Sequence, residues 1–167
     1  NFSIFKRPNN YVLENLKHAD FIFIISLLII DNSDNSEYFM YKFNLSNKEK
    51  KRILYLNDFY KKDVDLKFFN EKNLNQIFYF DGLTHLIDII QFKIYRSKKV
   101  EKKLVELIEI FKNKKTPIMP FGADFLIKKF NLAPSKNLGN KIKLIEAAWA
   151  KNNFSITEDQ INSIIQD

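Results

Sequence analysis

Paired carboxylates are the first residues in this chain that could do chemistry. Asp63 and Asp65 flank Val64 in an Asp-x-Asp motif, the spacing with which two-metal enzymes hold Mg²⁺. The motif lies in a polar segment between expected helices, and neither a glycine-rich phosphate loop nor an expected strand is near it. We therefore predict that these carboxylates cap a helix and face solvent, and we predict no metal site.

Two histidines are the other candidates for catalysis or metal binding. His18 precedes Asp20 by two residues, as in split His-Asp metal motifs, but a dinuclear site would need more histidines and only His85 remains. The chain has no cysteine, which excludes disulfides and thiolate metal sites. Signatures of Ser-His-Asp, Cys-His and P-loop sites are also absent. The sequence therefore predicts no catalytic residue, metal or cofactor in this chain, and it places His18 at the surface or at a helix C-terminus.

Lysine and arginine offer a different chemistry, the binding of a polyanion. The segment from Lys98 to Lys151 holds 13 lysines against 5 acidic residues, and the segment from Lys42 to Lys62 holds 7 basic against 2 acidic residues. The rest of the chain is net acidic, although the formal charge of the whole is +7. Two basic blocks on such a scaffold are typical of a protein that binds nucleic acid. The alternative is that these lysines only form solvated helix faces.

A proline- and glycine-rich stretch over residues 117–157 constrains the backbone inside the second basic block. It holds three of the four prolines and two of the three glycines. At the start of a short helix, Gly122 is expected to take a positive φ and Asp124 to cap free backbone donors.

A longer helix is expected to begin near Leu138. Its first-turn N–H groups, beside Lys136 and Lys141, would form a phosphate site. Gly139 in that turn would permit close approach by another backbone. The alternative is that Gly122 and Gly139 only allow two helices to pack.

The elements that must position these residues are predicted to be helices. Apolar residues make up 46% of the chain, with 17 phenylalanines, so the chain can bury a core, and three glycines are too few for the turns of a β-sandwich. Helix starts are marked by two capping boxes, Ser46 with Glu49 and Thr157 with Gln160. We predict an all-α fold, an irregular bundle of about 8–10 helices.

The longest apolar run spans Phe21–Ile30, which is about half of the ~20 residues that a membrane span needs. Asp20 is a plausible N-cap at its start, and a polar segment follows it in place of a signal-peptide cleavage site. We predict a buried helix here and no membrane partner. The chain begins with Asn1 and not with Met, which suggests a piece of a longer protein.

Two regions are expected, a helical body over residues 1–97 and a helical tail over residues 98–167. Lysine runs and prolines interrupt the helical periodicity near residues 96–99 and 113–117, so the boundary is expected at one of these places. Trp149 is expected in a core and not on a base-stacking surface, because Leu144 and Ile145 are its apolar neighbours.

Four segments occur in a distinctive order: LSNKEKKRI from Leu45, PIMPFGADFL from Pro117, LAPSKNLGNKIKLIEAAW from Leu132 and FSIT from Phe154. Over residues 45–164 their order and spacing resemble the C-terminal region of bacterial CCA-adding tRNA nucleotidyltransferases and the related poly(A) polymerases. One departure is Ser135, where the family often has glycine, which puts the tightness of that turn in doubt.

The resemblance implies a helical body and tail that grip the elbow and acceptor stem of tRNA. In that family an N-terminal head and neck add nucleotides to the RNA 3′ end, using Mg²⁺ with CTP and ATP, and the motifs of that head do not occur in this sequence. The implied partners are therefore tRNA and the head and neck of the same polypeptide. A cytoplasmic location is expected because the chain has no cysteine and nothing in it requires an oxidising compartment. Whether the parent protein adds CCA or poly(A) would be decided in that head.

Contacts to tRNA are expected mainly at phosphate and sugar, and so to be selective for shape and sensitive to salt. Gly122, Asp124 and Gly139 are expected to act as structural supports. The residues expected to bind phosphate are Lys48, Lys51, Arg52, Lys128, Lys129, Lys136 and Lys141.

An alternative from a different functional class is a non-catalytic helical protein-interaction module. Such a module would show a contiguous exposed apolar patch and no affinity for RNA.

Overall fold

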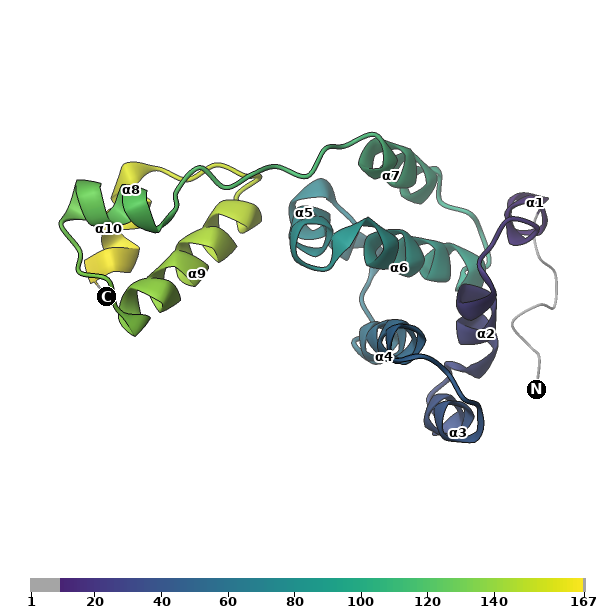
Figure 1. Cartoon of the computed structure of the whole chain (residues 1–167). Helices are drawn as coiled ribbons and strands as arrows, with labels where there is room; N and C mark the ends of the chain where they lie inside the picture. Colours follow the sequence, from purple (N-terminus) through teal and green to yellow (C-terminus); the bar gives the residue numbers. More distant parts are fainter. Residues whose placement is uncertain (1–9, 167) are drawn as a thin grey trace.

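The computed structural model describes residues 10–166, and the all-α prediction is confirmed: those residues form ten α-helices, one 3₁₀ helix and no strand (Figure 1). Pro8, expected in the first turn of the first helix, lies outside the described residues. The helices are α1 (Asn10–Leu16), α2 (Phe21–Ile29), α3 (Asn35–Lys42), α4 (Asn47–Lys61), η2 (Leu66–Phe68), α5 (Glu71–Phe80), α6 (Gly82–Arg96), α7 (Lys102–Lys112), α8 (Ala123–Phe130), α9 (Lys136–Lys151) and α10 (Glu158–Gln166).

Side-chain caps fix where several of these helices begin. Ser46 Oγ accepts from the backbone N–H of Glu49, whose carboxylate accepts in turn from the N–H of Ser46, so this predicted capping box is confirmed. Thr157 and Gln160 exchange the same pair of bonds before α10. Each box satisfies two backbone donors that a helix start leaves free.

The predicted helix over the long apolar run is also confirmed. Asp20 caps α2 by accepting from the N–H groups of Ile22 and Phe23. Leu27 and Ile30 are completely buried, so the run belongs to the core. Within the described part of the chain, no helix has both the length and the apolar character needed to cross a membrane.

Helices α1, α2 and α4 to α7 contribute side chains to the first of two hydrophobic cores. Helix α6 is central to it and packs against α4, α5 and α7, because apolar residues recur on its buried face at helical spacing. Helix α7 adds Leu104, Leu107, Ile108 and Phe111 to the same core. The boundary predicted at residues 97 and 98 is therefore not where the cores separate.

The second core lies between α8, α9 and α10 and is built around Leu126, Leu138, Ile145 and Ile161. Residues 113–122, which hold two of the prolines, form no helix and run between the two cores (Figure 1). The cores thus separate at the second predicted boundary, near residues 113–117. We refer to residues 10–112 as the body and to residues 123–166 as the tail.

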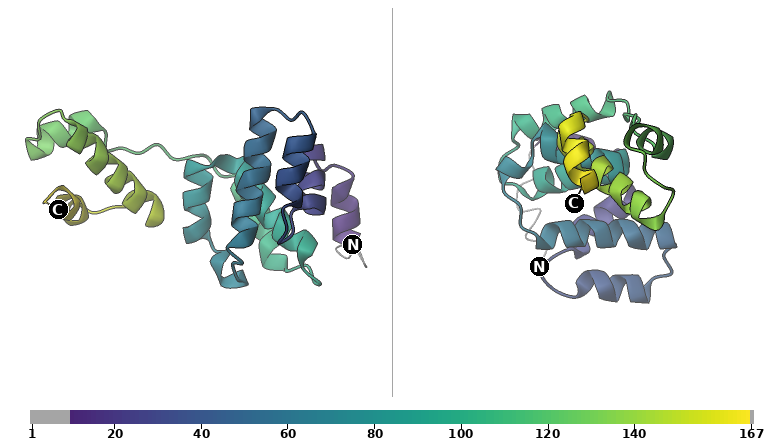
Figure 2. Two further views of the ribbon diagram at one scale, coloured as in Figure 1. Left: turned by 90° about the horizontal axis from the view of Figure 1, so that it is seen from below. Right: turned by 90° about the vertical axis from the view of Figure 1, so that its left-hand side faces the viewer.

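Helix α9 joins the tail to the body by docking its C-terminal half on α5. The Tyr79 hydroxyl donates to Glu146 at 2.7 Å, and the ring of Tyr79 lies 5.3 Å from that of Trp149. Trp149 is only 3% exposed, as predicted for a core residue. Because α9 contacts the body only near its end, body and tail lie one after the other along a long axis (Figure 2).

Candidate nucleic-acid interface

Arg52 lies where α4 meets α6 and the start of α2, and it is bound there by two carboxylates. Its Nε and Nη2 donate to the two oxygens of Asp88 at 2.6 and 2.9 Å, and its Nη1 donates to Asp20 at 2.6 Å. The hydrogen bond to Asp88 raises the pKa of Arg52. A guanidinium held in this way joins three helices, and its donors are directed at carboxylates and not at an external phosphate.

Two of the predicted lysines also have partners inside the chain. Lys141 donates to the carbonyl oxygens of Ile164 and Ile165, at 3.2 and 2.7 Å, and thereby caps the end of α10. Lys129 forms an ion pair with Glu158 at the start of that helix. Both contacts tie neighbouring tail helices together, which is a structural role.

The other four predicted lysines are exposed. Lys48 and Lys51 lie in the first two turns of α4, Lys128 lies in the last turn of α8, and Lys136 is the first residue of α9. Among the described residues, no carboxylate lies within 4 Å of their ammonium groups. These four side chains are therefore open to an external anion.

A further group of lysines, which we did not single out from the sequence, lies at the start of α7. Lys98, Lys99, Lys102 and Lys103 are all exposed. They form a run of like charge interrupted by Glu101, and that local density was the signal in the sequence that could have identified them.

Most of these exposed lysines lie at or just before helix starts, whereas Lys128 lies in the last turn of α8. The N-terminal end of a helix has a partial positive charge, so a lysine there costs about 0.3–1 kcal/mol. In α4 this charge is offset by Glu49 in the first turn, and in α7 Glu101 stands at the N-cap, but α9 has no acidic residue at its N-cap or in its first turn. An anion bound at these places would remove the repulsion.

These helix starts lie far apart on the molecule. Arg96, at the end of α6, donates to a carbonyl of α2, and Lys98 and Lys99 follow it directly on the way into α7, on the body. Helix α9 begins at the end of the tail that points away from the body (Figure 1). A small anion cannot reach both places, whereas a long polyanion can.

The three predicted structural supports behave differently from expectation. Gly122 has φ −84° and not a positive φ, because an extended residue suffices before α8, and α8 has no side-chain cap bond, so Asp124 does not cap it. Among the described glycines only Gly82 has a positive φ, of 87°. A Cβ on Gly139 would meet nothing within 4 Å, so no other part of the described chain approaches this turn closely. Ser135 caps α9 by accepting from the N–H of Leu138 at 3.1 Å.

The carboxylates and histidines considered first do not gather into a metal site. Asp65 accepts from the N–H of Phe68 at 3.1 Å and caps η2, which confirms the prediction of a helix cap. His18 is exposed just after the end of α1, as predicted. Over residues 10–166, no three His, Cys, Asp or Glu side chains lie close enough together to hold an ion.

Comparisons with known proteins leave the function open. Neither a protein-family model nor a curated protein nor a solved structure matches this chain. The resemblance to tRNA nucleotidyltransferases therefore stays a prediction, and the function has to be argued from the chain's own residues.

Proposed function

We propose that this chain binds structured RNA, and tRNA in particular, through the exposed lysines at the starts of α4, α7 and α9. The main observation behind the proposal is that these lysines are exposed and have no carboxylate partner in the described structure. Lysine binds phosphate as a point charge and does not read bases by itself. The contacts would thus select for the shape of the RNA backbone.

The spacing of the lysine groups favours a folded RNA over a small anionic ligand. Lys136 lies at the start of α9, which is at the far end of the tail, and the lysines before and at the start of α7 lie on the body (Figure 1). A folded RNA presents phosphates over that whole length, and each neutralised phosphate releases counterions and adds affinity.

The more specific proposal, that this is the tRNA-gripping region of a CCA-adding enzyme or poly(A) polymerase, is supported by the four sequence segments. Three of them form the tail: one leads into α8, one includes α9 and the last precedes α10. Nucleotide addition, with Mg²⁺, CTP and ATP, would then take place in a head and neck of the same cytoplasmic polypeptide.

A salt titration with two matched variants tests the proposal. We expect the chain to bind tRNA more tightly than duplex DNA of equal charge, with an affinity that falls steeply as salt rises. Replacing Lys48 and Lys51 with glutamine should weaken tRNA binding by about tenfold at moderate salt and reduce the salt slope. The K61Q/K62Q variant makes the same charge change at the other end of α4 and should have a smaller effect.

Equal losses in the two variants would mean that only net charge matters and would contradict the proposed interface. Equal affinity for tRNA and for the DNA duplex would contradict selection for RNA shape.

One observation supports the alternative function, a protein-interaction module. Aromatic side chains on and just after α3 are unusually exposed, with Tyr38 at 62%, Tyr41 at 88% and Phe43 at 52%. Exposed aromatics are typical of protein interfaces. Two results together would favour this alternative. The chain would show no affinity for any RNA at low salt, and it would bind a partner protein that the variant with Tyr38 and Tyr41 replaced by alanine no longer binds.

A further inference from the structure

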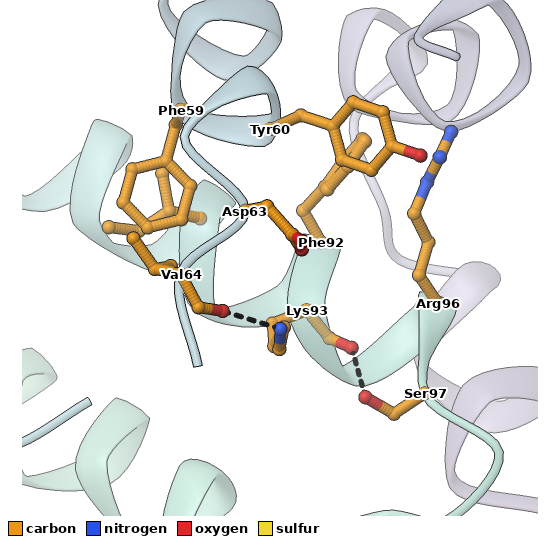
Figure 3. A pocket seen from close by; sticks show the side chains of 9 residues that line it. Phe59, Tyr60, Asp63, Val64, Phe92, Lys93, Arg96 and Ser97 are labelled. Atoms are coloured by element: carbon orange, nitrogen blue, oxygen red, sulfur yellow. Dashed lines mark hydrogen bonds between the residues drawn. The ribbon is translucent and has the colours of Figure 1, made fainter. Parts of the chain in front are cut away.

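A cavity of about 330 Å³ opens between α4 and α6 (Figure 3), and its lining ends at Ser97, the residue before the lysine run that leads into α7. Phe59 and Tyr60 line it from the end of α4, and Phe92 lines it from α6. Its volume falls within the range of small-molecule sites, and Phe59 and Tyr60, which are more exposed than Phe92, offer apolar walls to a planar group.

Two cations line the same cavity. Lys93 Nζ donates to the carbonyl oxygen of Val64 at 2.7 Å, and this bond holds the ammonium group at the wall of the cavity. In the described structure its other two N–H groups have no hydrogen-bond partner. The Arg96 guanidinium lies 4.6 Å from the ring centre of Tyr60 and 4.5 Å from that of Phe92. It donates to the carbonyl oxygens of Leu27 and Ile30.

The positive charge of this pair is not neutralised by an ion pair. Among the described residues, no carboxylate lies within 4 Å of Lys93 or Arg96, and the buried Nε of Arg96 has no hydrogen-bond partner. Burial lowers the pKa of Arg96, as expected for a charge that is partly removed from water. A negatively charged ligand group would offset this cost.

Asp63 adds a hydrogen-bond acceptor to the lining. Its backbone has φ 43°, in the left-handed region that residues other than glycine seldom adopt. Figure 3 shows its side chain in the space that Tyr60 and Lys93 also border. The cavity thus combines planar apolar walls, two cations and one carboxylate, which gives it a formal charge of +1.

We propose that this cavity binds a single nucleotide, with its phosphate at Lys93, its base against the aromatic walls and a ribose hydroxyl donating to Asp63. An aromatic amino acid would also present a ring, an anion and a donor, but it has no net charge. A nucleoside monophosphate has a net charge of about −1.5 to −2 at neutral pH, which complements the excess of cations over carboxylates in the lining.

This inference goes beyond the proposed RNA interface and does not depend on it. The nucleotide could be free in solution or be the unpaired end of an RNA, because both present a base, a ribose and a phosphate. Binding of a mononucleotide requires none of the exposed lysines at the starts of α4, α7 and α9.

The experiment measures binding of AMP and adenosine to the whole chain by calorimetry or by two-dimensional NMR. AMP should bind at least about tenfold more tightly than adenosine, because only AMP brings a charged acceptor to Lys93. The Lys93→Gln variant should lose that preference and keep its affinity for adenosine, which also shows that it is folded. Lys67→Gln makes the same charge change on exposed η2, outside the cavity, and should bind AMP like the unchanged protein.

Competition with oligonucleotides distinguishes a free nucleotide from the unpaired end of an RNA. An unpaired oligoadenylate that displaces AMP would identify an RNA end as the ligand, and an oligomer that fails to displace it would identify a free nucleotide. The K48Q/K51Q variant should bind AMP normally, so failure of the RNA interface and failure of this site are distinguishable.

Three results would overturn the proposal. These are no binding of AMP to the unchanged protein, equal effects of Lys93→Gln and Lys67→Gln, and tighter binding of tyrosine than of AMP. The comparison of AMP with adenosine uses the unchanged protein, so it decides the phosphate contact even if the Lys93 variant fails to fold.

Discussion

At the scale of single residues, Arg52 shows how its surroundings decide what a basic side chain does. Its neighbour Lys51 is exposed, whereas the side chain of Arg52 is 18% exposed and binds the 4% exposed side chain of Asp88. Burial raises the pKa of Asp88, so its carboxylate depends on Arg52 to remain charged in the core. The Arg52–Asp88 pair therefore stabilises the body, and the lysines beside it remain available to a ligand.

Removing Arg52 should destabilise the protein strongly. Arg52→Ala would leave Asp88 buried without its partner, so we expect the free energy of unfolding to fall by about 3 kcal/mol. Urea denaturation followed by circular dichroism measures the change. The control is Lys51→Ala, which should stay within about 0.5 kcal/mol of the unchanged protein. A loss below about 1 kcal/mol for Arg52→Ala would show that Asp88 finds other partners.

The sequence singled out basic residues as candidate phosphate contacts, but it did not predict the partners that several of them have inside the chain. The contacts of Arg52 with Asp88, of Lys129 with Glu158 and of Lys141 with the end of α10 join residues 23 to 36 positions apart. Such pairs depend on how helices pack, and hydrophobic periodicity does not specify which charged ends then meet. The capping boxes, by contrast, join residues three apart and were predictable.

At the scale of elements, the docking of α9 on α5 connects tail and body. The hydrogen bond from Tyr79 to Glu146 is at its centre, and this bond, with burial, raises the pKa of Tyr79 to about 12. Lys114, in the segment between the cores, donates to Asn75 of α5 at 2.7 Å, close to the same junction. The contact between body and tail is thus partly polar, and pH should affect it.

We expect alkaline pH to weaken this docking. A tyrosine in the unfolded chain ionises near pH 10, whereas Tyr79 in the folded chain ionises at about 12. Between these values the folded state binds more protons than the unfolded state, so its stability falls as pH rises through that window and the contribution is complete only below about pH 10. Urea unfolding at a series of pH values measures this decline.

The Tyr79→Phe variant should lose this part of the pH dependence. The exposed Tyr41 provides the control, because Tyr41→Phe should leave the alkaline decline in stability unchanged. Identical alkaline curves for Tyr79→Phe and the unchanged protein would contradict the role assigned to the Tyr79–Glu146 bond.

Element types were largely predictable, because start signals and apolar spacing are local. The assignment of α7 to the body core was not predictable. The lysine run before it suggested a boundary, but Leu104, Leu107 and Phe111 of α7 lie in the body core. Charge on an exposed turn says little about which core the opposite face of a helix joins. The positive φ expected for Gly122 was also wrong, because the proline-rich segment enters α8 with Gly122 in extended backbone.

At the scale of the whole molecule, two hydrophobic cores lie along one axis (Figure 2), and both the body and the tail have exposed lysines. This length distinguishes the proposed RNA interface from the cavity between α4 and α6. The cavity has room for one small ligand, whereas the lysine groups suit a polyanion as long as the protein. The all-α class was predictable from composition and periodicity, but the separation of the lysine groups was not, because it depends on how α9 docks.

The most direct test of the account asks whether one tRNA contacts body and tail together. Lys102 and Lys103 of the body, and Lys128 and Lys136 of the tail, should be replaced with glutamine in pairs and all at once, and tRNA affinity measured at several salt concentrations. We expect each pair to weaken binding and lower the salt slope by about 0.7–0.9 per lost phosphate contact, and the fourfold variant to show the sum of both losses. Unchanged affinity in both pairs, or a fourfold variant no weaker than one pair alone, would contradict a single RNA bound along the whole molecule.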